Sequence, residues 1–84
     1  FITFAKADIK SLQQAFLNGE LATIRMLGHK MQSSARQLGA TRFADICVSL
    51  EKQQDPDAML RVHPSIGQLE KLLTQIAQQL QLNG

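Results

Sequence analysis

The chain has 84 residues, of which 44% are hydrophobic and 19% charged, and its formal net charge is +2. This length allows one small domain and excludes a second, while the apolar content is too high for a disordered chain. The mild charge gives no footprint for nucleic acid, and no apolar run approaches the ~20 residues that cross a bilayer, so we expect residues 1–84 to form one packed domain without nucleic-acid or direct membrane contact.

The first two predicted helices are separated by a short break. Apolar residues at helical spacing predict a helix over residues 6–17, which a break at residues 18–19 ends. A second helix is predicted over residues 21–38 and closed by Gly39, a residue type common just after a helix. Helices joined by so short a break are expected to be antiparallel neighbours. The apolar stripe of the first helix is Ile9, Leu12 and Phe16.

The third predicted helix begins near Thr41, which we expect to be its N-cap, and fades at residues 53–55. Its apolar residues have the i, i+3, i+4, i+7 spacing of one helix face and are Phe43, Ile46, Cys47 and Leu50. Cys47 is the one cysteine, so an internal disulfide is impossible and the thiol is expected to behave as a small hydrophobe. A reducing, cytoplasmic setting is therefore expected.

A connection that contains both prolines, residues 55–64, precedes the fourth predicted helix at residues 65–82. Pro56 suits the first position of a helical turn, which we expect over residues 57–62. His63 lies in this connection and is expected to be a solvated loop residue without a role. The apolar stripe of the fourth helix is Ile66, Leu69, Leu73, Ile76 and Leu80.

These elements predict the fold class. Each predicted helix has one apolar stripe, which it has to bury against its neighbours, and nothing in the chain alternates as a strand does. Short connections place consecutive helices antiparallel. We therefore predict an all-α fold, an antiparallel up-down four-helix bundle that is monomeric as an isolated domain.

The second helix carries a histidine whose direction follows from a helical wheel. With about 100° per residue, His29 lies opposite an apolar side that is predicted to face the core. That side consists of Ile24, Leu27, Met31, Ser34 and Leu38. Within about 60° of the histidine lie Arg25, Met26, Gln32, Ser33 and Arg36. The imidazole is therefore expected to point into water on a polar, cationic face.

An exposed imidazole on such a face is suited to phosphoryl transfer. Its reference pKa is ~6.5, so near neutral pH a large fraction has a free nitrogen lone pair that can attack phosphorus without a dedicated base. Phosphoryl transfer depends mainly on positioning and on charge neutralisation, which nearby arginines, a lysine or a metal ion of a partner can supply.

Residues 29–40 read HKMQSSARQLGA. This run resembles the signature of the histidine-containing phosphotransfer (HPt) domains of bacterial phosphorelays, roughly H-x-(L/M)-K-(G/S)-(S/A)-(S/A)-x-x-(L/V)-G-(A/L). The resemblance extends to nearly the whole chain. Residues 18–20 resemble the helix break that precedes the histidine helix in this family, and residues 42–51 resemble the helix that follows it.

The resemblance implies that His29 is the phosphoacceptor and that Ser33 is the small residue that lets a partner approach the imidazole closely. Where the family usually has a lysine that helps to neutralise the phosphoryl group, this chain has Gln32. Arg25 or Arg36 is expected to supply that charge, and the Gln32 amide can donate a hydrogen bond to a phosphate oxygen. The residues expected to bind the phosphoryl group or the partner are Ala22, Arg25, Met26, Lys30, Gln32, Ser33 and Arg36.

The resemblance also implies the partners. The domain is expected to be a phosphorelay intermediate that takes a phosphoryl group from a receiver-domain aspartate and passes it to a response-regulator aspartate. It would be a phosphocarrier and not an enzyme, with no cofactor or metal of its own, and Mg2+ would lie in the partner receiver. The parent is expected to be a hybrid sensor histidine kinase anchored in the inner membrane, with this domain in the cytoplasm.

Four other functions share some features of this sequence. A helix-turn-helix DNA binder is disfavoured because Ile46 is one position off the required spacing after Ala35 and Gly39, and because the charge is low. A metal site is disfavoured because His29, His63 and Cys47 lie on different predicted elements. A serine hydrolase using Ser33 lacks a carboxylate on the histidine face to orient the imidazole. The remaining alternative is an HPt-like docking or dimerisation module that is not phosphorylated.

Overall fold

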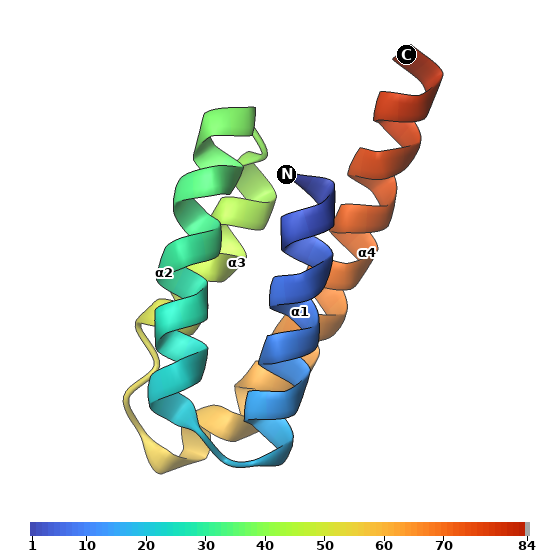
Figure 1. The fold of residues 1–84 in the computed structure, drawn as a ribbon. Coiled ribbons are helices and arrows are strands. Elements are labelled where there is room, and N and C mark those ends of the chain that lie inside the picture. Colours follow the sequence, from blue (N-terminus) through green and yellow to red (C-terminus); the bar gives the residue numbers. More distant parts are fainter. Residues whose placement is uncertain (84) are drawn as a thin grey trace.

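The computed structural model describes the backbone of residues 1–83 and, except at positions 56 and 81–83, their side chains. It consists of four α-helices, which run alternately up and down, and one short 3-10 helix in the connection before the last of them (Figure 1). In chain order they are α1 (Ile2–Leu17), α2 (Leu21–Leu38), α3 (Thr41–Glu51), the 3-10 helix η1 (Pro56–Ala58) and α4 (Met59–Asn83). The predicted all-α antiparallel four-helix bundle is confirmed, as are both ends of α2.

Helix α1 begins four residues earlier than predicted. The carbonyl of Phe1 accepts a hydrogen bond from the Ala5 amide at 2.8 Å, and Ile2 packs against the core. The ring of Phe1 meets that of Phe43 in α3 edge to face, with 5.5 Å between centroids. This contact between distant segments holds the first turn in place, and helical periodicity within the segment gives no sign of it.

Helix α3 does not have the predicted N-cap. Ala40 occupies that position and its carbonyl accepts the first helical hydrogen bond, from Ala44, at 3.0 Å. Thr41 is already the first helical residue. The shift by one residue follows from Gly39, whose φ of +85° reverses the chain so tightly that the next helix starts at once.

Helix α4 begins six residues before the predicted start. The predicted helical turn over residues 57–62 is confirmed, since η1 and the first turn of α4 cover it, whereas residues 63–64, expected to be a loop, are also helical. Pro64 lies inside α4, and His63 is an exposed helical residue. The proline ring removes one hydrogen bond, but Val62 before it is fully buried. Val62 and Ile66 lie on the same buried stripe, one turn apart on either side of Pro64. Because both positions are buried only if the helix continues, packing in the core stabilises a helix that includes the proline.

The core lies between all four helices, and α2 and α3 form the most extensive contact. Its largest fully buried side chains are Leu12, Ile24, Phe43, Leu50, Val62 and Leu69. Two predicted core residues of α2, Ser34 and Leu38, are exposed, and Gly28 and Ala35 are buried in their place. Around the axis of α2, the centre of the buried side lies about 40° from the point opposite His29, in the direction of Gly28. The buried side is displaced in this direction because α3 packs against the side of α2 that carries Gly28.

The last turns of α4 project beyond the other three helices, next to the end where α1 begins (Figure 1). Leu80, predicted as part of the buried stripe, is 49% exposed there. It has the correct spacing for the core, but no neighbouring helix reaches far enough to cover it. No helix within residues 1–83 is long and apolar enough to cross a membrane.

Candidate functional site

His29 lies midway along α2 with its side chain 70% exposed, as the helical wheel predicted. Its Nδ1 lies 2.9 Å from Oε1 of Glu51, the last residue of α3. A carboxylate accepts hydrogen bonds, so this contact favours the tautomer in which Nδ1 carries the proton. Nε2 then has a free lone pair, and no described residue forms a hydrogen bond with it.

The Glu51 carboxylate corrects one prediction. We expected no carboxylate on the histidine face, because the wheel of α2 contains none there. The acid comes from α3, which the antiparallel packing places alongside α2, with its C-terminal end next to His29. Glu51 belongs to the stretch that resembles the HPt helix after the histidine helix, but its spacing of 22 residues from His29 carries no local signal.

Glu51 also contacts two further residues of α2. Its backbone carbonyl accepts a hydrogen bond from Arg25 Nε at 3.2 Å. The side-chain amide of Gln32, in the orientation that gives each of its atoms a complementary partner, donates from Nε2 to Glu51 Oε2 at 2.8 Å. In that orientation Gln32 Oε1 accepts from Arg36 Nη2 at 3.0 Å. We call His29, Arg25, Gln32, Arg36 and Glu51 the histidine cluster.

A glycine of α2, Gly28, makes the close approach of α3 to α2 beside the histidine cluster possible. A Cβ added to Gly28 would lie 2.8 Å from the Cys47 carbonyl oxygen, 3.1 Å from the Glu51 nitrogen and 3.2 Å from Leu50 Cβ. Two of these atoms belong to the backbone, which cannot rotate away. The residue before the histidine therefore sets the distance between α2 and α3, a role that sequence reasoning missed because a glycine inside a helix has many explanations.

The remaining predicted site residues divide into two groups. Ser33, Ala22 and Met26 are exposed on α2, and Met26, at 64% exposure, is a large apolar side chain left in water. Lys30 instead belongs to the contact between α2 and α1. Its Nζ lies 3.1 Å from Oδ1 of Asp8, whose side chain is largely buried, so Lys30 is engaged away from the histidine cluster.

The histidines and the cysteine lie too far apart in the fold to share a metal ion. His29, Cys47 and His63 lie on three different helices, and no group of three metal-ligating side chains exists among the described residues. Burial raises the pKa of the Cys47 thiol to about 12.

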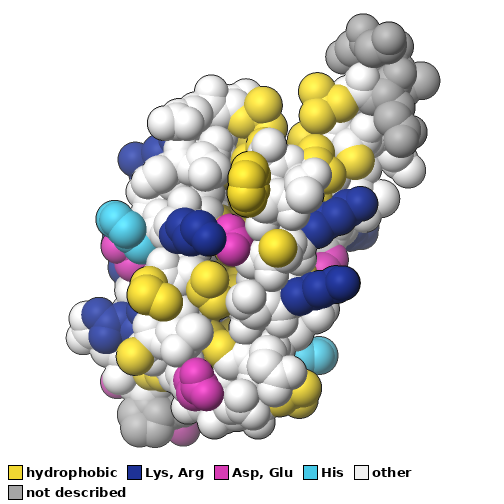
Figure 2. Space-filling view, viewed as in Figure 1, with side chains coloured by type: hydrophobic (Ala, Val, Ile, Leu, Met, Phe, Trp, Pro, Cys, Tyr) yellow, Lys and Arg dark blue, Asp and Glu magenta, His cyan; other side chains and the backbone are white. Residues whose placement is uncertain are grey.

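Lys and Arg side chains are scattered over α1 and α2 on the face shown in Figure 2 and do not form one basic patch there.

The family model described as Hpt domain matches residues 1–79 of the chain. No curated protein and no solved structure matches. The matched residues include all five members of the histidine cluster.

Proposed function

The chain belongs to the Hpt domain family, and on that basis we propose that His29 accepts a phosphoryl group from the aspartyl phosphate of a receiver domain and passes it to an aspartate of a response regulator. Hpt domains act in phosphotransfer in two-component signalling and are phosphocarriers without catalysis of their own. The observation that supports His29 in particular is its geometry: Nδ1 is held by Glu51, and the ring is exposed.

The proposed step uses both ring nitrogens. The Nε2 lone pair forms a bond to phosphorus while the bond between phosphorus and the aspartyl oxygen breaks, and the aspartate leaves as a carboxylate. The proton on Nδ1 stays in place, so the ring becomes cationic as Nε2 is phosphorylated. The Glu51 carboxylate at 2.9 Å stabilises this charge through a charged hydrogen bond, and the reverse step transfers the group onward.

In the proposed step two arginines neutralise the phosphoryl oxygens. Arg25 is anchored by the Glu51 carbonyl and Arg36 by the Gln32 amide, and both lie on the same face of α2 as His29. Arg36 is two turns further along, and long helical side chains lean toward the N-terminus, which directs its guanidinium back over Gln32. Gln32, which already donates to Glu51, mainly orients this cluster and does not replace the usual lysine as a charge.

The proposed partner surface is the exposed part of α2 around His29. Met26 and Ala22 supply apolar contact, Ser33 leaves space beside the imidazole, and the arginines complement an acidic receiver pocket that contains Mg2+. We further propose that the domain works in the cytoplasm as part of a hybrid sensor histidine kinase, for which a buried, free Cys47 thiol is suitable.

The test uses a receiver domain that carries radiolabelled aspartyl phosphate, mixed with the wild-type domain, a His29→Gln variant and a His63→Gln variant. We expect label on the wild type and on His63→Gln that is stable in base and lost in acid, and none on His29→Gln. Label that persists in His29→Gln would move the site elsewhere. The absence of transfer from every receiver tried, with a folded helical domain, would overturn the proposal in favour of a docking or dimerisation module.

A further inference from the structure

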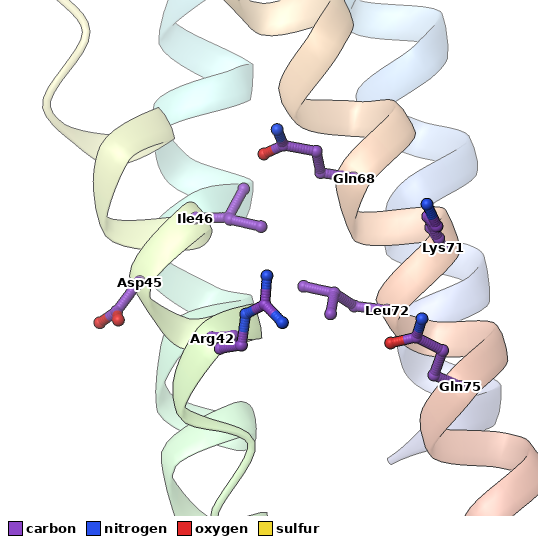
Figure 3. A pocket seen from close by; sticks show the side chains of 7 residues that line it. All are labelled: Arg42, Asp45, Ile46, Gln68, Lys71, Leu72 and Gln75. Carbon is purple, nitrogen blue, oxygen red and sulfur yellow. The ribbon is translucent and has the colours of Figure 1, made fainter.

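A groove of about 530 Å³ lies between α3 and α4, and the proposed phosphotransfer does not use it. Three side chains of α3 and four of α4 line it: Arg42, Asp45, Ile46, Gln68, Lys71, Leu72 and Gln75. Figure 3 shows Ile46 and Leu72 pointing toward each other across the gap, whereas the Asp45 carboxylate lies on the outer side of α3. The groove therefore has an apolar floor, and its one acidic residue points away.

The rim of the groove offers hydrogen-bond donors that the fold does not use. Arg42 extends into the gap from α3, and Lys71 lies at the outer rim on α4. Neither forms an ion pair or a side-chain hydrogen bond with any described residue. The amides of Gln68 and Gln75 are likewise without described partners. Two cations and two amides around an apolar floor are complementary to a ligand with apolar and acidic groups side by side.

Helix α4 extends the apolar floor along its length. Leu72, Ile76 and Leu80 follow one another at intervals of four residues, and their exposure increases from partly buried to 49% at Leu80. An elongated apolar stripe with charges beside it fits a helix laid along α4 better than it fits a small molecule.

We propose that this groove is a second docking site, which binds an amphipathic helix of a partner protein whose apolar stripe is flanked by acidic side chains. A second copy of this chain is a poor occupant, because a symmetric contact through the groove would bring the two cations of one copy, Arg42 and Lys71, close to the same two cations of the other. On α3, Arg42 and Glu51 are nine residues apart and thus about 180° apart around the helix. A partner in the groove therefore leaves the histidine cluster free for a receiver.

The experiment titrates the isotope-labelled domain with a designed helical peptide of about 18 residues, roughly 27 Å long, that has leucines every fourth position flanked by glutamates. A second peptide has lysine at every glutamate position. The acidic peptide is expected to shift the amide signals of Arg42, Ile46, Leu72 and Gln75 and to leave that of His29 unchanged. The basic peptide is expected to cause no shifts.

Two charge-reversal variants decide the assignment. Arg42→Glu combined with Lys71→Glu is expected to weaken binding of the acidic peptide at least tenfold, while phosphotransfer through His29 stays unchanged. Lys6→Glu combined with Lys10→Glu makes the same change in net charge on α1 and is expected to leave the affinity within twofold. Equal losses in both variants, shifts centred on α1, or no binding at millimolar peptide would each overturn the docking site without bearing on His29.

Discussion

The contact between His29 and Glu51 joins the proposed phosphoacceptor to a carboxylate that the chain supplies from another helix. If Glu51 fixes the tautomer and stabilises the cationic ring, Glu51→Ala should slow transfer to His29 by about tenfold or more, since a hydrogen bond to a charged group contributes ~1.5–3 kcal/mol. The initial rate with a phosphorylated receiver measures this, together with the 15N signals of the imidazole, which should show both tautomers. Glu70→Ala, on α4, should leave the rate unchanged. An unaltered tautomer in Glu51→Ala would contradict the assigned role.

The charge beside the histidine can be tested at the same scale. Arg36→Gln should lower the transfer rate roughly fivefold, because an exposed cation is partly screened by solvent. The loss should diminish as salt is added. Introducing Gln32→Lys into the Arg36→Gln variant should restore the rate, since it returns a cation to the same face. Arg61→Gln removes an equal charge on α4 and should have no effect. A double variant as slow as Arg36→Gln would show that position matters more than charge.

At the scale of helices, the spacing of α2 and α3 depends on Gly28. Gly28→Ala places a Cβ against two backbone atoms of α3, and the overpacking should lower the free energy of unfolding by ~1–3 kcal/mol. Gly67→Ala is the matched control, because nothing lies within 4 Å of its added Cβ, and alanine should stabilise α4 by ~0.5–1 kcal/mol. Urea unfolding measures both. Since α3 carries Glu51, the Gly28→Ala variant should also transfer more slowly. A stabilised Gly28→Ala variant would show that the helices separate easily.

The whole molecule determines how Cys47 titrates. Its pKa is raised from 9.0 to about 12 because burial disfavours the thiolate. The unfolded chain therefore ionises first as pH rises, so the stability associated with the neutral thiol is complete below pH 9 and is lost between pH 9 and 12. At pH 10.5 the loss should be about 2 kcal/mol relative to pH 7. Urea unfolding of the wild type and of Cys47→Ala isolates this loss from lysine titration. Parallel pH profiles for the two proteins would contradict it.

Much of the bundle was predictable because helix periodicity is local. The ends of α2, the stops at Gly19 and Gly39, and the exposure of His29 follow from the order of apolar and polar residues over a few turns. The run from His29 to Ala40 gave the family resemblance, which the family model confirms. None of these features requires knowledge of where another helix lies.

Features that depend on how the helices rotate and slide against one another were not predictable in this way. Glu51 meets His29, and Gly28 meets the backbone of α3, because α2 and α3 pack in one particular register. Helix α4 continues through Pro64 because Val62 is needed in the core, and Leu80 is left exposed because no helix is long enough to cover it. The chain's local pattern thus specifies which residues are helical and that the His29 imidazole is presented to solvent. The contacts of that imidazole come from long-range packing, whose free energy depends on contacts between segments far apart in the sequence.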